Sequence, residues 1–524
     1  MMIRQRWLPE RTARFALAAA GAIALGIGAP PSWAPANAQG GQTQQQGDME
    51  MTDTQIAAAI DDALFNDAIT PSYQIDVSVV DGIANLTGAA NSLAGKRRAA
   101  RLAETVRGVR SVSNRIKVEP LVEVSDSELV ENVTEQLLTN PATSSYQIDA
   151  EAGDGTVTLT GQVESWAERD LADRIAASVI GVKAIDNQIE IDYVEDHSDE
   201  EIQRLIDERL YWDTHVDDAL IEVSVDEGVV TLDGTVGSAA EKSRATTLAW
   251  IDGVQDVKTE PLDVDAWARD ERFRAQKYQS RGEDATEDAI KDALIYDPRV
   301  IAANVTPKIS GSSVTLRGTV GSLDAKRAAE SIAQRTVGVS WVTNRLKVRP
   351  TDPTTDSEIG SRVAQRLTRD AVVERNEIDV NVIGGVAYLE GLVNTFYEKA
   401  MADTIAAQTP GVVDVVNQLE VSDVTAQTYS PYVDTWSIYD LDWYGSEPMH
   451  TFRADQEIRE DIRGEMWWSP FVDADEVTVA VDEGVATLTG EVDSWSERSA
   501  ARENAFEGGA VWVVNNIDVD TDDG

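Results

Sequence analysis

The chain has no cysteine and only three histidines among its 524 residues. Without cysteine it forms no disulfide, thiolate zinc site or cysteine nucleophile, and a mature N-terminus cannot be acylated as in a lipoprotein. His197, His215 and His450 each lack a partner at metal-ligand spacing. Nucleophile-elbow, phosphate-loop and dinucleotide-binding motifs are absent as well. The sequence therefore predicts a protein that is not an enzyme, with no catalytic, cofactor-binding or metal-binding residue.

Basic residues are also scarce, because 45 lysines and arginines face 92 aspartates and glutamates, and only 11 of the bases are lysine. The formal net charge at pH 7 is −47. Residues 1–38 contribute +3, from four arginines and one glutamate, so the remainder carries −50. Such a surface repels nucleic acids and anionic lipid headgroups and favours solubility. We therefore expect no nucleic-acid partner, and the excess of acids over lysine also fits a high-salt habitat.

Long apolar runs are absent beyond residues 15–29, which form an uncharged stretch of 15 residues near the N-terminus. Four arginines precede this stretch, and a small-x-small sequence at residues 36–38 follows it. A run this short, flanked in this way, is typical of a removable secretory signal peptide. We predict a signal peptide over residues 1–38 and export to the periplasm. A flexible Gln/Gly-rich leader over residues 39–51 follows, and no transmembrane segment is expected in the mature chain.

What the sequence does contain is one pattern, Leu-x-Gly, repeated six times. Its glycines are separated by 73, 73, 84, 73 and 99 residues. Recurrence at this spacing indicates tandem copies of one small domain. The six glycines, which we take as structural signature residues of the repeat, are Gly88, Gly161, Gly234, Gly318, Gly391 and Gly490.

Each copy follows the same plan around its signature glycine. Alternating apolar residues on both sides of a tight turn, as at residues 75–79 and after Gly82, predict a β-hairpin with one buried face. Four residues after the signature glycine, a serine or threonine begins a second helix, and in four copies a glutamate completes a capping box. Alanines four apart form a flat stripe on this helix, which ends at Gly-Val before a last strand in five copies and at Gly-Gly-Ala-Val in copy six. With an amphipathic helix upstream, the predicted unit is α-β-β-α-β over about 65 to 70 residues.

This order of helix, hairpin ending in Leu-x-Gly, capped alanine helix, Gly-Val and Asn-x-[Ile/Leu]-x-Val resembles the BON domain of bacterial envelope proteins. The resemblance implies an α+β fold: a tandem array of six small α-β-β-α-β sandwich domains, each with two helices packed on a small mixed sheet. Copy three departs from it, with Thr259 in place of an asparagine that we assign to Asn516 in copy six. The copies are placed at residues 52–119, 125–192, 198–264, 285–349, 355–421 and 455–520, with a polar linker at 265–284 and an aromatic linker at 422–454.

Similarity to osmotically inducible periplasmic BON proteins implies a non-enzymatic role in the cell envelope. We expect the chain to bind phospholipid or envelope proteins in protection against osmotic stress, through contacts spread over six rigid modules. The alternative is a structural or assembly subunit associated with a secretin-like or channel ring, since BON domains also occur beside such segments. The lack of a membrane segment of its own counts against this alternative. The sequence leaves the oligomeric state open.

Aromatic side chains are the candidate contact residues. Six of them lie within 16 residues of the aromatic linker, and this cluster predicts either an exposed binding surface or a structural clasp between copies five and six. Two tryptophans near the start of the second helix, in copies two and six, are candidates to contact a neighbouring copy or a partner, and the alternative is packing at the rim of their own core, the commoner role of such a tryptophan. The candidates are Tyr429, Tyr432, Trp436, Tyr439, Trp443, Tyr444, Trp166 and Trp495.

Overall fold

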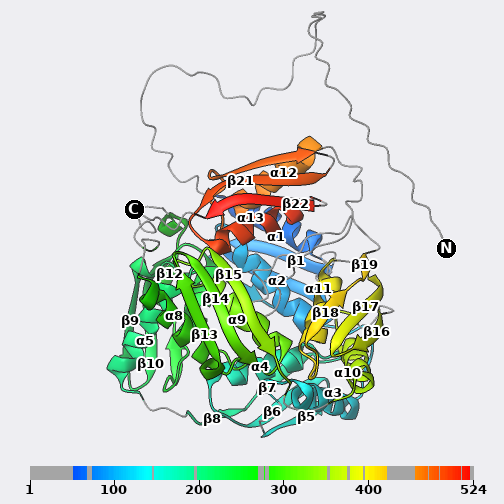
Figure 1. Cartoon of the computed structure of the whole chain (residues 1–524). Helices are drawn as coiled ribbons and strands as arrows, with labels where there is room; N and C mark the ends of the chain where they lie inside the picture. Colours follow the sequence, from blue (N-terminus) through cyan, green and yellow to red (C-terminus); the bar gives the residue numbers. More distant parts are fainter. Residues whose placement is uncertain are drawn as a thin grey trace, which may run out of the picture. The chain divides into compact units, whose positions relative to one another are not determined.

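Copy one shows the repeated unit: two helices and four strands follow one another along the chain. Its helices α1 and α2 and strand β1 are labelled in Figure 1. Strand β1 pairs with β2 antiparallel, and β2 pairs with β3 and β4 in parallel, so β2 is the central strand of a small mixed sheet. The predicted α+β class and α-β-β-α-β order are confirmed. The elements are α1 (Asp53–Asn66), β1 (Ile75–Val80), β2 (Ile83–Ala90), α2 (Leu93–Thr105), β3 (Ser111–Asn114) and β4 (Lys117–Val118).

Copies two and three repeat this order. Copy two comprises α3 (Asp126–Thr139), β5 (Gln147–Gly153), β6 (Thr156–Val163), α4 (Trp166–Ala177), β7 (Ala184–Asn187) and β8 (Glu190–Ile191). Copy three comprises α5 (Asp199–Trp212), η2 (Asp218–Leu220), β9 (Ile221–Asp226), β10 (Val229–Val236), α6 (Ala239–Leu248), β11 (Asp256–Lys258) and β12 (Leu262–Val264). A short 3₁₀ helix, η3 (Ala266–Arg269), follows copy three.

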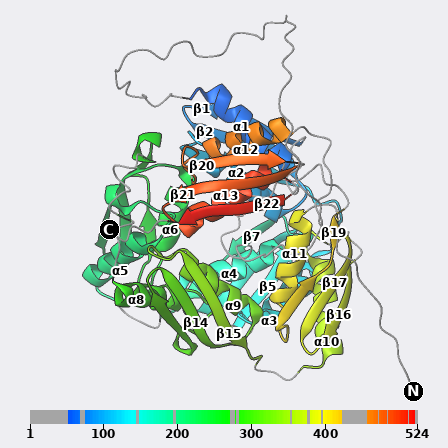
Figure 2. The ribbon, with the colours of Figure 1, turned by 45° about the horizontal axis from the view of Figure 1, so that its top comes forward.

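The last three copies have the same order, and Figure 2 shows the strands of copy six side by side. Copy four comprises α8 (Glu283–Ile295), η4 (Ala302–Asn304), β13 (Val305–Ser310), β14 (Ser313–Val320), α9 (Leu323–Gln334) and β15 (Trp341–Val348). Copy five comprises α10 (Asp356–Arg369), β16 (Ile378–Ile383), β17 (Val386–Val393), α11 (Phe396–Ala407), β18 (Asp414–Asn417) and β19 (Glu420–Val421). Copy six comprises α12 (Asp455–Trp468), β20 (Val477–Asp482), β21 (Val485–Val492), α13 (Trp495–Glu507) and β22 (Trp512–Val519).

The computed structural model describes most of the repeat region. No helix within the described residues combines the length and apolar character that crossing a bilayer requires. The described residues are 51–67, 74–143, 147–193, 197–269, 277, 282–350, 354–373, 378–393, 396–421, 455–469, 471–482, 484–508, 510 and 512–519.

Each copy has a hydrophobic core of its own. In copy one, Ile60 on α1 and Leu86 on β2 are fully buried, as are Ala99 and Ala103 on α2. The two alanines are one helical turn apart, so they lie on the same face of α2. Their small side chains let this helix lie close against the sheet, as the alanine stripe predicts.

Steric crowding explains why the signature position is glycine. Gly88 has φ +105°, and a Cβ atom there would lie 2.0 Å from the carbonyl oxygen of Gln74. Gly318 in copy four has φ +134°, with the carbonyl oxygen of Asn304 only 1.9 Å from the same position. L-residues rarely adopt this backbone conformation, and here the partner strand leaves no space for a side chain.

The first residue of each copy's first helix holds the hairpin turn, a contact that the sequence analysis did not predict. In copy one, the carboxylate of Asp53 accepts hydrogen bonds from the backbone N–H groups of Asp81 and Gly82, at 2.9 and 3.0 Å. Copy four uses Glu283, which accepts from the N–H of Gly311. The acid therefore fixes the turn against the helix start. The equivalent acids of the other copies are Asp126, Asp199, Asp356 and Asp455.

The asparagine of the last strand ties that strand to the second helix. Asn114 donates from Nδ2 to the carbonyl oxygen of Lys96 at 2.7 Å, and its Oδ1 accepts from the N–H of Ile116. In copy six the residue that makes both contacts is Asn515, so the assignment to Asn516 is wrong. The pattern places the asparagine two residues before the buried Ile517, and that position is 515.

Copies one and two meet in the same way as copies four and five. Leu93, the first residue of α2, belongs to the core of copy two. Leu323, the first residue of α9, belongs to the core of copy five. At both interfaces, the arginine nine residues after the signature glycine also forms an ion pair with an aspartate of the next copy. These ion pairs join Arg97 to Asp173 and Arg327 to Asp403.

Contacts also join copies that are distant in sequence. Val179 of copy two forms a β-bridge with Asp370 of copy five, and Asp213 of copy three forms one with Thr336 of copy four. The sequence analysis did not predict these contacts between distant copies. These backbone bridges connect the two halves of the repeat region.

Candidate functional site

The aromatic candidates have different outcomes. The six residues of the predicted aromatic linker, from Tyr429 to Tyr444, lie outside the described residues, and so does the side chain of Trp495. Trp166, the first residue of α4, is described. Its ring stacks on that of Trp250 in copy three, with centroids 5.3 Å apart and planes 5° apart. Trp166 therefore contacts the neighbouring copy three, and contact with a partner or lipid stays a prediction.

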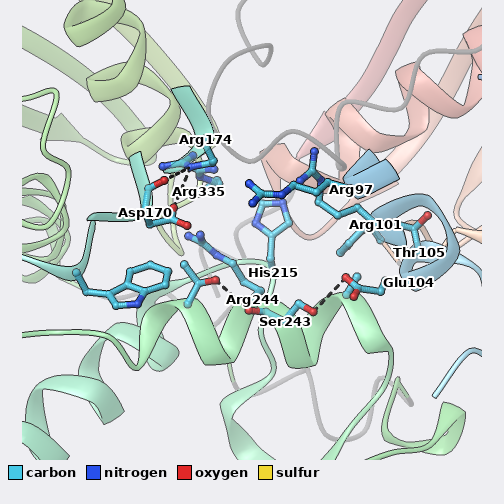
Figure 3. A pocket seen from close by; sticks show the side chains of 14 residues that line it. Arg97, Arg101, Glu104, Thr105, Asp170, Arg174, His215, Ser243, Arg244 and Arg335 are labelled. Carbon is cyan, nitrogen blue, oxygen red and sulfur yellow. Dashed lines mark hydrogen bonds and ion pairs between the residues drawn. The ribbon is translucent and has the colours of Figure 1, made fainter. Parts of the chain in front are cut away.

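Trp166 also lines a cavity of about 270 Å³. Most of its wall comes from copies one, two and three, with Arg335 of copy four and Phe471 of copy six completing it. Figure 3 shows the labelled arginine side chains converging from several elements. The cavity is unusual for so acidic a chain because five arginines line it. They are Arg97, Arg101, Arg174, Arg244 and Arg335.

Equivalent faces of three equivalent helices build this wall. On α2, α4 and α6, the ninth and thirteenth residues after the signature glycine line the cavity. Residues four apart lie on one face of a helix, so each helix presents the same face. The six residues are Arg97 and Arg101, Asp170 and Arg174, and Ser243 and Thr247.

Backbone contacts between copies three and four bring in the remaining basic groups. The N–H of Thr214 donates to the carbonyl oxygen of Arg335 at 3.0 Å, beside the bridge between Asp213 and Thr336. His215 follows directly, and its ring meets that of Phe471 edge-on, with centroids 5.6 Å apart. The β-bridge thus places His215 and Arg335 on the same cavity.

Carboxylates pair with several of the arginines. Asp170 lies 2.9 Å from Arg174, one helical turn away on α4. Asp213 binds Arg244 from beside the cavity and is itself almost fully buried. Among the described residues, two carboxylates, those of Asp170 and Glu104, line the wall itself, and Asp173 pairs with Arg97 from beside it. The five arginines therefore outnumber the acids of the wall.

Burial dominates the pKa values of two basic groups on the wall. It lowers the pKa of Arg174 to about 10, although the charges of Asp170 and Asp297 oppose the change and those of Arg299 and Arg101 add to it. Burial also lowers the pKa of His215, although Asp213 opposes the change, and the charges of Arg244 and Arg335 add to it. Removal from water therefore disfavours the charged form of each group.

Glu104 stands out among the acids. Its carboxylate accepts a hydrogen bond from the Ser243 hydroxyl at 3.1 Å, which links α2 to α6. Burial raises the pKa of Glu104 to about 7, although Ser243 and Arg101 act in the opposite direction. A part of the Glu104 population is therefore neutral near pH 7, which further reduces the negative charge on the wall.

The chemistry of this wall is that of anion binding. Guanidinium groups present forked donors that match the oxygens of phosphate and carboxylate groups. Within the described residues, no group of three or more histidine, aspartate or glutamate side chains is placed to hold a metal ion.

The sequence analysis missed the cavity, although a signal was present. When the copies are aligned on the signature glycine, the thirteenth position is arginine in copies one and two only. The overall composition, in which bases are scarce, hides this difference between the copies. The other four copies have Thr247, Ser331, Thr404 and Glu503 at this position.

Comparison with known proteins gives a consistent family. The family model described as "BON domain" matches residues 52–120, 125–193, 198–265, 282–350, 355–423 and 454–521. "Osmotically-inducible protein Y" of Escherichia coli (strain K12) is 32% identical over 145 residues, which cover 26% of this chain and 72% of that protein. An Anaplasma centrale protein, "Uncharacterized protein in gshII 5'region", is 28% identical over 126 residues, 23% of this chain and 83% of that one. These matches indicate no catalytic family.

Among solved structures, the search found a structural protein of the type III secretion system of Chlamydia trachomatis, CdsD. It is 15% identical, and the match covers 43% of this chain and 93% of that one with a TM-score of 0.12. A likeness this distant carries no functional argument.

Proposed function

This chain belongs to the BON-domain family, and from that premise we propose that it is an exported, non-enzymatic envelope protein that acts in osmotic stress protection. The observation that carries the proposal is the 32% identity to Osmotically-inducible protein Y over 145 residues, a length of about two BON copies. The basic, apolar and small-residue order of residues 1–38 supports export to the periplasm.

In this proposal the protein acts by binding envelope proteins or phospholipid. The excess of acidic residues opposes broad adsorption to an anionic bilayer, so a lipid contact must be local and a protein contact is favoured. The proposed surface for partner binding consists of the aromatic residues from Tyr429 to Tyr444, which are identified from the sequence alone.

Export is tested by expressing the tagged chain in a bacterium with a periplasm. We expect the protein in the periplasmic fraction, with a mature N-terminus at Gln39 by mass spectrometry. An uncleaved cytoplasmic protein would contradict the proposal.

The osmotic role is tested by deleting the gene, which should slow growth in hyperosmotic medium and leave growth in ordinary medium unchanged.

Partner binding is tested by capture from envelope extract, with the intact chain and with a variant that lacks residues 422–454. We expect specific partners for the intact chain and fewer for the deletion variant. Co-sedimentation with liposomes across salt and calcium concentrations tests whether the protein binds phospholipid. Light scattering tests the alternative role as a ring subunit, because a monodisperse monomer is incompatible with ring assembly.

A further inference from the structure

We propose that the arginine-lined cavity at the junction of copies one, two and three binds a phosphate group, carried by a small soluble molecule or by a lipid headgroup. A soluble ligand would go beyond the envelope role, whereas a lipid headgroup would specify the phospholipid contact proposed above and rests on it. Nothing in the BON-domain match assigns ligand binding to these residues.

Charge is the first argument. The chain has roughly twice as many acids as bases, yet among the described residues five arginines and two carboxylates line this cavity. Even with Asp173 and Asp213, which pair with Arg97 and Arg244 from beside the wall, the arginines outnumber the acids. Bringing guanidinium groups together in a partly buried space costs electrostatic free energy. A bound dianion offsets that cost, because each of its oxygens accepts charge-assisted hydrogen bonds.

Comparison within the molecule is the second argument. The interface between copies four and five has the same leucine anchor and the same arginine–aspartate pair as the interface between copies one and two. At the positions of Arg101 and Arg174, however, it has Ser331 and Thr404. The interface therefore forms without these two arginines, so packing alone does not account for them.

Size is the third argument. The cavity holds about 270 Å³, several times the ~30 Å³ that one water molecule occupies in the liquid. It lies at the small end of the volumes typical of ligand sites. A phosphate group with a few further atoms fits this space, and the Trp166 ring forms part of the wall beside it.

The test is isothermal titration calorimetry of the intact protein with sodium phosphate and with glycerol phosphate, against sodium chloride at matched ionic strength. We expect saturable binding of a phosphate compound that chloride does not reproduce. The double variant R101S/R174T carries the residues found in copies four and five and should weaken this binding at least about tenfold, as expected when two charge-assisted contacts are lost. Absence of phosphate-specific heat in the intact protein together with absence of binding to phosphatidylglycerol vesicles, or unchanged affinity in the double variant, overturns the proposal.

A matched pair of single variants separates the cavity from the interface. Arg97 and Arg327 make the same ion pair at equivalent positions, but only Arg97 lines the cavity. Arg97→Gln should weaken phosphate binding, and Arg327→Gln should leave it unchanged. Equal loss in both variants would mean that the effect is structural and would contradict the proposal.

Vesicles distinguish the two sources of the phosphate group. Phosphatidylglycerol vesicles that bind the intact protein and lose binding with R101S/R174T would assign the site to a lipid headgroup. Binding of glycerol phosphate without vesicle binding would assign it to a soluble ligand. Vesicle binding that survives in the double variant, with no heat from soluble phosphate, would overturn the proposal.

Discussion

The interface between copies one and two and the interface between copies four and five share a framework and differ in their polar residues. In both, a leucine from the first helical position enters the next copy's core, and an arginine pairs with the next copy's aspartate. The first interface adds Arg101, Arg174 and Glu104 at positions where the second has Ser331, Thr404 and Gln334. The comparison separates what the fold requires from what is added to it: the leucine and the ion pair are common, and the charged cavity is particular to one half.

The largest expected effect tests the shared framework. Leu93→Ala and Leu323→Ala each remove a buried side chain from the core of the following copy, at a cost of about 3 kcal/mol. Because the interfaces are equivalent, the two losses should be similar. Hydrogen exchange measured peptide by peptide should show lower protection in copy two for the first variant and in copy five for the second. Loss confined to the mutated copy would mean that the leucine does not bridge the copies.

A smaller effect concerns Glu104, whose counterpart is the uncharged Gln334. The folded pKa of Glu104 is raised to about 7 from an ordinary value of 4.5, so the folded state holds the proton more tightly between these values. Stability therefore falls as pH rises from 4.5 to 7 and stays lower above pH 7. Glu104→Gln should have little effect at pH 4.5 and should stabilise copy one by about 2 kcal/mol at pH 8, allowing for partial solvent screening.

The measurement is chemical denaturation or hydrogen exchange of both proteins across pH 4.5 to 8. Gln334→Glu is the reciprocal variant, and it should lower stability at pH 8 if the second site is as buried as Gln334 indicates. A Glu104→Gln effect that does not change with pH would contradict the raised pKa.

The smallest effect is a difference between the two ion pairs. Asp403 is 4% exposed and Asp173 is 18% exposed, so loss of the arginine leaves a more deeply buried charge in copy five. Arg327→Gln should therefore cost about 1 kcal/mol more than Arg97→Gln. Denaturation midpoints of the two variants, measured in phosphate-free buffer, test this order, and an equal or reversed order would show that burial does not set the cost.

Sequence reasoning recovered the repeated unit because the features that define it are local. Leu-x-Gly, the serine or threonine cap and the alanine stripe each follow from the geometry of one turn, one helix start or one helix face. The prediction for copy six is wrong by one residue, because two asparagines are adjacent at positions 515 and 516. Only Asn515 lies two residues before Ile517, as the pattern requires.

The cavity could not be predicted in the same way, because it depends on contacts between copies. Arg101 and Arg174 are 73 residues apart in sequence, and Arg335 lies in another copy. Their convergence rests on the bridge between Asp213 and Thr336 and on the packing of α2 near α6, which no local pattern encodes. The sequence signal for the cavity is the residue thirteen positions after the signature glycine, which is arginine in copies one and two only. This signal can be interpreted only when the contacts between the copies are known.

The most direct test of the proposed ligand role of Arg101 and Arg174 is the stability of R101S/R174T in phosphate-free chloride buffer. If the two arginines serve a ligand and the fold does not need them, the double variant should unfold within about 0.5 kcal/mol of the intact protein, or at higher denaturant concentration. A loss of about 2 kcal/mol or more, with reduced protection across copies one and two, would show that the arginines hold the interface together and would contradict the account.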